Sequence, residues 1–261
     1  MPPSRGSDSG IQSVSRALGI LELFEEQRPA LTTTQVAGLT GLNRATAYRF
    51  CQTLLNLGYL EEVGQGTFRP GLKAVSLAQA ALRSHELPDL ALPYLRQLRE
   101  RTGQTVNMAL LDPPDVIYVS RLLNDSLLAL RLFVGSRLPA HATSMGRAAL
   151  AFLPDDERDA ILDGVELTPI TEHTITDRRR LQAELRRIRN RGYAVNEQQM
   201  VAGIRGVAAP VFGILGRPIA AVNVSLTRPF EADEPESLAK DVVETAAAVS
   251  ALATQLAVDV G

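Results

Sequence analysis

One segment near the N-terminus constrains the fold of this chain more than any other feature of its sequence. Thr32 followed by Gln35 fits a capping box, which predicts the start of a short helix. Thr40 and Gly41 then suit a tight turn, and Asn43 is placed to cap a second helix. Two helices joined by so short a glycine turn are typical of a helix-turn-helix motif.

The residues that follow extend this motif into a hairpin. The second helix has an apolar stripe at three- and four-residue spacing, made of Ala47, Phe50, Cys51, Leu54 and Leu57. Gly58 ends that helix, and two strand-like runs, 59–63 and 67–69, flank the glycine-rich turn 64–66. A helix-turn-helix followed by a hairpin is the winged pattern, in which the second helix lies in the major groove of DNA.

The face of the second helix opposite its apolar stripe carries side chains that can contact DNA. Arginine can bind guanine or phosphate, and threonine can contact a thymine methyl group or a phosphate. No Asp or Glu occurs between Gln27 and Leu60, so no carboxylate would repel phosphates there. The candidate DNA contacts are Asn43, Arg44, Ala45, Thr46, Tyr48 and Arg49 on this helix, Gln65 at the hairpin tip, and Arg16 on the preceding helix. The alternative is a solvated face of a helical domain that binds no DNA.

Composition and charge exclude several other classes of protein. The 261 residues are 45% hydrophobic and carry a net charge of −2, which suits two globular domains and excludes a polybasic binder. Cys51 is the single cysteine, so an intramolecular disulfide framework is excluded, and its apolar surroundings favour a core residue over a redox sensor. The longest apolar stretch, 206–216, is shorter than the roughly 20 residues that span a bilayer. Because residues 1–10 contain no apolar signal region either, we expect a cytoplasmic protein without a membrane partner.

The remainder of the chain mixes helical and strand-like patterns. The helices that we expect cover 11–27, 71–84, 88–103, 144–152, 156–162, 178–191 and 235–257. The strands that we expect cover 106–111, 116–122, 128–134, 193–198, 206–212 and 219–226. The fold class is therefore α+β. We expect a disordered tail at 1–10, a winged helix-turn-helix domain at 11–70, a linker helix at 71–87 and a second domain at 88–261.

Several strings of residues, in order, resemble one family. SVSRALGILELF, LTTTQVAGLTGLNRATAYRFCQTLLNLGYLEEV, LPAHATSMGRAALAFLP and IRGVAAPVF resemble IclR-type transcriptional regulators, and the resemblance covers nearly the whole chain from Ile11 onwards. It implies a winged helix-turn-helix domain, a connecting helix and a C-terminal GAF-like α/β domain that binds a small effector. It also implies a homodimer or homotetramer on palindromic operator DNA. NRATAYRF, SMGRA and AVNVS look most like the regulators of protocatechuate and β-ketoadipate catabolism.

The resemblance also implies an effector cavity at one end of the GAF-like sheet. The segment that contains His141, Ser144, Met145 and Gly146 matches one wall of that cavity in the family. This segment opens a helix, and a helix N-terminus offers free N–H groups and a positive dipole end. It is therefore suited to a carboxylate, although Ser144 can also serve simply as a helix cap and His141 as a structural hydrogen-bonding residue.

Other cavity positions follow from the same resemblance. Leu127 and Leu130 match apolar wall positions, and Asn223 and Ser225 match a polar pair on the last strand. Alternate residues of a strand face the same side, so both members of this pair can enter one cavity. The alternative for this pair is that it satisfies backbone groups at a sheet edge.

Two cavity positions depart from the family pattern. Asn196 matches a position that is often acidic in relatives, and Gly206 matches one that is often Cys or Ser. A neutral Asn196 tolerates a more anionic ligand, and Gly206 leaves space for a ring or a longer diacid. Arg121 and Arg131 lie near strand ends, where solvated ion pairs are expected, although either could pair with an acidic ligand. The arginine-rich segment 178–191 reads as a solvated helix face.

The sequence does not favour an enzyme. It has no nucleophile elbow, phosphate-binding loop or H-E-x-x-H motif, and its three histidines form no metal-ligand pattern, so no cofactor is expected. We expect a ligand-responsive transcriptional regulator that senses a small carboxylic acid and controls aromatic-acid catabolism. The alternatives are a regulator of another carbon pathway with a glyoxylate- or pyruvate-like effector, and a DNA-binding dimerisation protein with a vestigial pocket.

Overall fold

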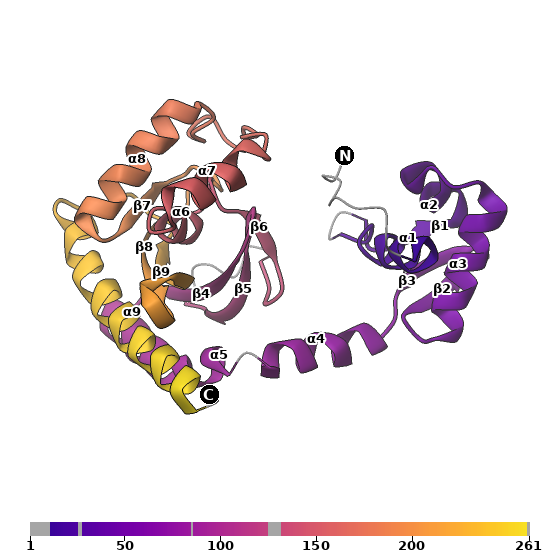
Figure 1. The fold of residues 1–261 in the computed structure, drawn as a ribbon, viewed down its shortest axis with the longest axis horizontal. Coiled ribbons are helices and arrows are strands. Elements are labelled where there is room, and N and C mark those ends of the chain that lie inside the picture. The colour runs from indigo at the N-terminus through magenta and orange to yellow at the C-terminus, as the bar shows by residue number, and fades with distance from the viewer. Residues whose placement is uncertain (1–10, 26–27, 85, 125–131, 260–261) are drawn as a thin grey trace. The chain divides into compact units, whose positions relative to one another are not determined.

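The computed structural model describes residues 11–25, 28–84, 86–124 and 132–259, and the chain divides into two compact units, Met1–Ser84 and His85–Gly261 (Figure 1). Among the described residues, no helix combines the length and apolar character that crossing a bilayer requires.

The first unit contains four helices and a small sheet within the described residues. Its helices are α1 (Gln12–Leu21), α2 (Thr33–Thr40), α3 (Arg44–Asn56) and α4 (Lys73–Ser84), and its strands are β1 (Leu31–Thr32), β2 (Leu60–Gly64) and β3 (Thr67–Pro70). The sheet has the order β1-β3-β2 and is antiparallel. The helix-turn-helix and the hairpin predicted from the sequence are therefore confirmed, and the two-residue strand β1 is an addition to them.

The polar residues singled out in the sequence form the expected caps. The Thr32 hydroxyl accepts a hydrogen bond from the Gln35 backbone N–H at 3.3 Å, and the Gln35 side-chain oxygen accepts one from the Thr32 backbone N–H at 2.8 Å. Gly41 ends α2 with a positive φ of 71°, and the Asn43 side chain accepts from the Thr46 backbone N–H at 2.8 Å. The core behind these helices consists of Ile20, Leu31, Val36, Ala47, Cys51, Leu54, Leu60 and Phe68.

The second unit is built on a six-stranded antiparallel sheet. Its strands are β4 (Thr105–Asp112), β5 (Asp115–Leu122), β6 (Arg137–Pro139), β7 (Ala194–Glu197), β8 (Arg205–Phe212) and β9 (Pro218–Leu226), in the order β6-β5-β4-β9-β8-β7. Its helices are α5 (Leu87–Thr102), α6 (Ser144–Leu150), α7 (Asp155–Asp163), α8 (Arg178–Arg191) and α9 (Glu234–Asp259), with a 3-10 turn η2 (Ile214–Gly216). Helices α5 and α9 cover one face of the sheet, and α6 lies on the other together with α7 and α8 (Figure 1).

One expected strand is wrong in its described part. Residues 128–131 of the expected strand 128–134 lie outside the described residues, and 132–134 form no strand. The Ser136 backbone N–H donates to the Phe133 carbonyl at 3.0 Å, and Gly135 adopts a positive φ of 95°. These residues make a turn, and the strand begins only at Arg137.

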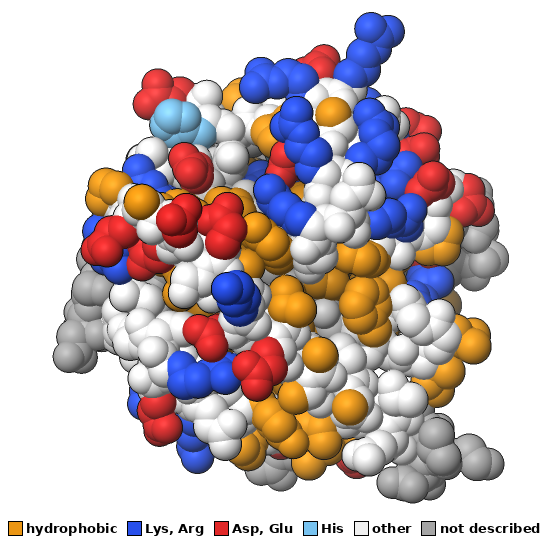
Figure 2. Space-filling view, turned by 90° about the vertical axis from the view of Figure 1, so that its left-hand side faces the viewer, with side chains coloured by type: hydrophobic (Ala, Val, Ile, Leu, Met, Phe, Trp, Pro, Cys, Tyr) orange, Lys and Arg blue, Asp and Glu red, His pale blue; other side chains and the backbone are white. Residues whose placement is uncertain are grey.

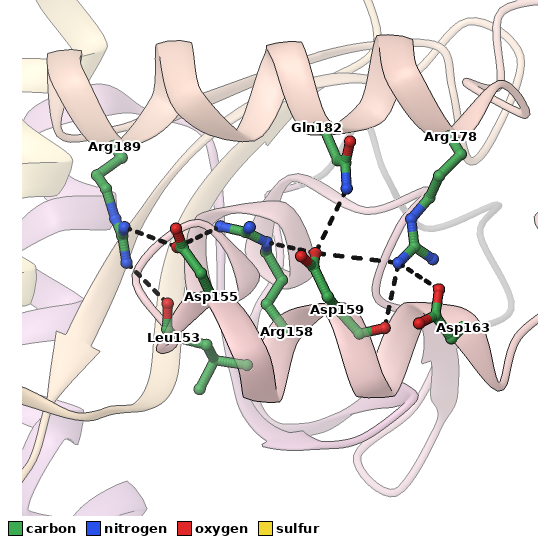
Figure 3. Close-up of polar contacts among 8 residues, drawn as sticks. All are labelled: Leu153, Asp155, Arg158, Asp159, Asp163, Arg178, Gln182 and Arg189. Carbon is green, nitrogen blue, oxygen red and sulfur yellow. Dashed lines mark hydrogen bonds and ion pairs between the residues drawn. The ribbon is translucent and has the colours of Figure 1, made fainter.

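Helices α7 and α8 are joined by a line of ion pairs (Figure 3). At one end Arg189 binds Asp155 at 3.1 Å, and at the other Arg178 binds Asp163 at 2.8 Å. Leu181, Leu185 and Ile188 form the buried stripe of α8. Five other arginines of α8 are exposed, namely Arg179, Arg180, Arg186, Arg187 and Arg191. Figure 2 shows Lys and Arg side chains gathered over the upper part of the face that it presents, which is the left-hand side of Figure 1. The arginine-rich helix therefore uses part of its charge inside the fold and exposes the rest.

Helix α6 packs closely against the segment that precedes it. A Cβ atom added at Gly146 would overlap the backbone of Ala140. All seven residues of α6 are buried. Any side chain at this position must therefore push the helix away from the chain that leads into it.

We predict that Gly146→Ala destabilises the second unit, because overpacking of this kind costs about 1–3 kcal/mol. Differential scanning calorimetry should show a lower melting temperature. The matched control is Gly38→Ala in α2, since nothing lies within 4 Å of a Cβ added there. Alanine favours a helix over glycine by about 0.5–1 kcal/mol, so the control should not destabilise the protein. Equal melting temperatures for Gly146→Ala and the wild type would contradict this account of the packing.

Candidate functional site

Helix α3 presents the candidate DNA contacts on its solvent face. Arg44, Ala45, Tyr48 and Arg49 are exposed, and Thr46 is half-buried. Among the described residues, neither Arg44 nor Arg49 forms an ion pair, so both guanidinium groups are available to phosphates or bases. The buried side of the same helix holds it in the core of the first unit.

The remaining DNA candidates lie on other parts of the first unit. Asn43 uses its side-chain oxygen to cap α3, and its amide N–H groups have no hydrogen-bond partner among the described residues. Gln65 is exposed at the hairpin tip, and Arg16 is exposed on α1. The Gly66 carbonyl accepts from the Thr33 backbone N–H at 2.8 Å, so the hairpin tip is tied to the start of α2.

The second unit contains a cavity at one end of its sheet. It has a volume of about 50 Å³, and the residues around it come from all six strands, the start of α6 and nearby loops. They are Thr105, Asn107, Tyr118, Arg121, Leu132, Leu138, Thr143, Ser144, Asn196, Met200, Val201, Ile204, Arg205, Gly206, Asn223 and Ser225. These residues include Arg121 and no Asp or Glu, so the described wall of the cavity favours an anion.

The register of the sheet explains why polar side chains gather there. Asn107 of β4 lies opposite Arg121 of β5 and opposite Asn223 of β9. The next row of opposed residues runs Thr105, Ser225, Gly206 and Asn196 across β4, β9, β8 and β7. Residues directly opposed in antiparallel strands share one face, so both rows point into the cavity.

Asn223 is the centre of a buried hydrogen-bond cluster. Its amide nitrogen donates to the Ser225 hydroxyl at 2.9 Å and to the Ser144 hydroxyl at 3.3 Å. Its amide oxygen accepts from the Asn107 amide nitrogen at 2.8 Å. The Asn107 amide oxygen is buried and has no hydrogen-bond partner among the described residues. The cluster therefore leaves one buried acceptor unsatisfied.

Arg121 is the most unusual side chain of the cavity. Its Nε and Nη1 atoms are buried and have no partner among the described residues, and its guanidinium carbon lies 5.9 Å from the centre of the Tyr118 ring. Burial lowers the pKa of Arg121, and burial raises the pKa of Tyr118 to about 12. The expectation that Arg121 forms a solvated ion pair is wrong, because no carboxylate of the described chain pairs with it.

Gly206 does not leave the space for a ligand that the sequence suggested. A Cβ added at Gly206 would lie 2.8 Å from the Val224 carbonyl oxygen and 3.3 Å from the Asn223 amide nitrogen. The Val224 carbonyl and the Asn223 amide therefore already occupy the space that a side chain at Gly206 would need. Glycine is required here for close packing of the cluster, and it does not open room for a ring.

Of the residues at the start of α6 that the sequence predicts in the cavity wall, fewer line the cavity than expected. Ser144 lines the cavity, whereas His141, Met145 and Gly146 are buried outside the lining. The His141 ring lies 3.4 Å from the Thr168 carbonyl, and burial lowers the pKa of its imidazole. Thr143 caps α6 by accepting from the Gly146 backbone N–H at 2.9 Å, so this N–H is not free for a ligand.

Other predicted residues divide between the cavity and the undescribed part of the chain. Asn196 lines the cavity and donates to the Ala142 carbonyl at 2.8 Å. Leu127 and Leu130, with Arg131, lie outside the described residues. In the part of the chain that the structure describes, no group of His, Cys, Asp and Glu could hold a metal ion.

Comparison with known proteins matches both units. The IclR helix-turn-helix domain matches residues 13–64, and the bacterial transcriptional regulator IclR C-terminal domain matches residues 79–251. The HTH-type transcriptional regulator XynR of Escherichia coli is 35% identical over 82% of this chain and 86% of its own length. The Pca regulon regulatory protein of Pseudomonas putida is 34% identical over 84% and 76%.

A solved structure extends the likeness to the fold. The crystal structure of an IclR homologue from Microbacterium hydrocarbonoxydans in complex with 4-hydroxybenzoate aligns with a TM-score of 0.77 at 25% identity. The alignment covers 92% of this chain and 98% of that chain.

We predict that Arg49→Ala weakens binding to DNA without unfolding the first unit, because the side chain is exposed and unpaired among the described residues. Loss of a base contact should cost about 1–3 kcal/mol, whereas loss of a phosphate contact should make the salt dependence shallower. Fluorescence anisotropy over a range of salt concentrations separates the two.

The control for Arg49→Ala is Arg28→Ala, which removes an arginine paired with Glu25 at 2.7 Å. If both variants bind DNA as tightly as the wild type at every salt concentration, the solvent face of α3 is not the DNA interface.

Proposed function

The chain belongs to the IclR family of bacterial transcriptional regulators, and we propose that it binds operator DNA in the cytoplasm and senses a small carboxylic acid in its second unit. Its relatives are transcriptional regulators, and the chain is accordingly a regulator and not an enzyme. The exposed, unpaired arginines of α3 support the assignment of this helix to the major groove.

One observation carries the choice of a carboxylic acid. The described lining of the cavity holds the guanidinium of Arg121 and no carboxylate, while Ser144, Asn223 and Ser225 supply neutral hydrogen-bonding groups. A buried cation without an anion is unfavourable, and a ligand carboxylate would supply the missing partner. Leu132 and Leu138 supply apolar contact for the carbon skeleton of such an acid.

We further propose that the acid derives from aromatic catabolism. Support comes from the likeness to the Pca regulon regulatory protein and from the homologue that was solved with 4-hydroxybenzoate. The identity to the Pca protein, 34%, is close to the 35% shared with XynR, so identity alone does not separate these pathways. The motif resemblance of NRATAYRF, SMGRA and AVNVS is what favours the aromatic pathway.

The cavity volume favours a second candidate, a two- or three-carbon acid such as glyoxylate or pyruvate. The cavity has a volume of about 50 Å³. A cavity that holds benzene in an engineered protein has a volume of about 150 Å³. An aromatic effector therefore requires the side chains around the cavity to move outward, and flexible Met200 is the best placed to do so.

The regulator would act as a homodimer or homotetramer on a palindromic operator. Val14 and Leu18 of α1 and Leu77 of α4 are exposed and border an apolar groove of the first unit, a surface that a second copy can cover. An effector that binds one arrangement of the oligomer better than another would change the spacing of the two recognition helices. A coupling of about 1–3 kcal/mol is enough for such regulation.

We predict that Asn223→Leu weakens effector binding and leaves DNA binding intact. The variant removes the centre of the cavity's hydrogen-bond cluster, and a buried ligand oxygen that loses its partner costs about 1–3 kcal/mol. Isothermal titration with protocatechuate, β-ketoadipate, pyruvate and glyoxylate measures the effect. Asn190→Leu, which changes an exposed Asn of α8, is the matched control.

The wild-type titrations decide between the candidates. Binding of protocatechuate or β-ketoadipate supports the aromatic pathway, and binding of pyruvate or glyoxylate alone supports the small-acid candidate. If the wild type binds no acid and its DNA affinity never changes, the pocket is vestigial and the proposed sensing function is wrong.

A further inference from the structure

Among the described residues, two residues that border the proposed effector cavity hold buried polar atoms without a hydrogen-bond partner. These atoms are the N–H donors at Nε and Nη1 of Arg121 and the amide oxygen of Asn107. The two residues are directly opposed across β5 and β4, so their side chains leave the sheet side by side. The wall of the cavity therefore offers two unused donors beside one unused acceptor.

A β-bulge directs Arg121 into the cavity. Ala109 lies opposite Tyr118, and the next residue back along β4, Met108, lies opposite Ser120, so Val119 is an extra residue in β5. In a regular strand, Tyr118 and Arg121 would face opposite sides because they are three residues apart. The extra residue reverses the alternation and brings both onto the cavity face. Bulges of this kind re-aim side chains next to functional sites.

We propose that the effector is a hydroxy acid, whose carboxylate binds the Nε and Nη1 of Arg121 and whose hydroxyl donates a hydrogen bond to the amide oxygen of Asn107. This inference rests on the proposed function of the cavity as an effector site. It names the anchoring residue and narrows the ligand from carboxylic acids in general to those that also carry a hydroxyl.

Other polar groups of the cavity are less suited to the carboxylate. The hydroxyls of Ser144 and Ser225 accept hydrogen bonds from the Asn223 amide and can still donate their own protons, but they carry no charge, and a hydrogen bond to a charged donor is the stronger one. Arg205 also borders the cavity, but it directly precedes Gly206 in β8. A side chain added at Gly206 would point at the cluster of Asn223 and Ser225. Successive residues of a strand face opposite sides, so the Arg205 side chain leaves the other face of the sheet.

The polar atoms of Arg121 and Asn107 without partners explain why a hydroxy acid would be preferred over other ligands. An acid without a hydroxyl leaves the Asn107 oxygen buried and unpaired, and a neutral amide leaves the Arg121 charge without an anion. Sites built from buried polar groups reject ligands that lack the matching partner more strongly than apolar pockets reject a missing methylene. The hydroxy acid should therefore bind best within any series of fixed carbon skeleton.

The test uses an aromatic and a three-carbon ligand series, so that the size of the carbon skeleton does not decide the outcome. The aromatic series is 4-hydroxybenzoate, benzoate and 4-hydroxybenzamide, and the three-carbon series is lactate, propionate and lactamide. Isothermal titration of the full-length wild type should rank the hydroxy acid first in whichever series binds. Arg121→Gln should lower affinity for that acid by about 10- to 100-fold, the range expected for a charged hydrogen bond. It should also abolish the preference for the acid over the amide.

Arg186→Gln is the matched control, because it removes the same charge from an exposed position on α8 that does not border the cavity. It should change affinity for the acid by less than about threefold, since an exposed surface charge is screened by salt. If Arg121→Gln and Arg186→Gln weaken binding equally, the effect is one of net charge and Arg121 is not the anchor.

Thermal melting without ligand separates a binding role from a structural one. Since Nε and Nη1 of Arg121 are buried without partners in the described part of the chain, Arg121→Gln should leave the melting temperature of the free protein unchanged or raise it. A large drop would mean that Arg121 supports the fold, and would overturn the proposal. Arg121→Lys keeps the positive charge. If Arg121 binds the carboxylate, this variant should retain part of the preference for the acid over the amide.

Failure of this inference is distinct from failure of the proposed function. If the wild type binds pyruvate or β-ketoadipate but neither hydroxy acid, the effector site stands and the hydroxy-acid inference is wrong. Unchanged hydroxy-acid affinity in Arg121→Gln likewise overturns the inference alone. If no acid of any series binds the wild type, the effector function itself is wrong.

Discussion

The hydrogen bond between Asn107 and Asn223 is the interaction on which the cavity of the second unit depends. It joins β4 to β9 by side chains at the end of the sheet, at a distance of 2.8 Å, and both residues are buried. It fixes the Asn223 amide so that its nitrogen reaches Ser144 and Ser225. The Asn107 amide nitrogen donates this bond, and its amide oxygen is buried without a partner among the described residues. This buried pair therefore orients the polar side chains of the cavity wall.

The first unit depends on local capping in a comparable way. Two short-range caps, at Thr32 and Asn43, fix where α2 and α3 begin. With the helix start fixed, the apolar stripe that includes Ala47 and Cys51 determines which face is buried, and Arg44 and Arg49 are left outside. A surface that can bind DNA is therefore a consequence of packing on the other side of the same helix.

Features that depend on neighbouring residues could be predicted from the sequence, and those that depend on distant strands could not. The caps at Thr32 and Asn43 and the helix 178–191 follow from local spacing and are confirmed. Alternation correctly places Asn223 and Ser225 on one face. Asn107 was missed because only the register of β4 against β9 brings it to Asn223.

Arg121 was misjudged for a related reason. Simple alternation from the core residue Tyr118 turns it away from the cavity, and the bulge at Val119 that reverses this has no signal in a single sequence. Gly206 was read as open space because its close neighbours come from β9, which is distant in sequence. The cavity is thus made by contacts across strands, where local patterns carry little information.

The central claim is that an acid in the cavity and DNA on α3 are linked. The most direct measurement is the affinity of the full-length protein for the DNA upstream of its own gene, with and without saturating 4-hydroxybenzoate or lactate, whichever binds. The account predicts that the acid changes the DNA affinity about 5- to 150-fold and that the DNA changes the acid affinity by the same factor. An acid that binds tightly while the DNA affinity stays constant would contradict it.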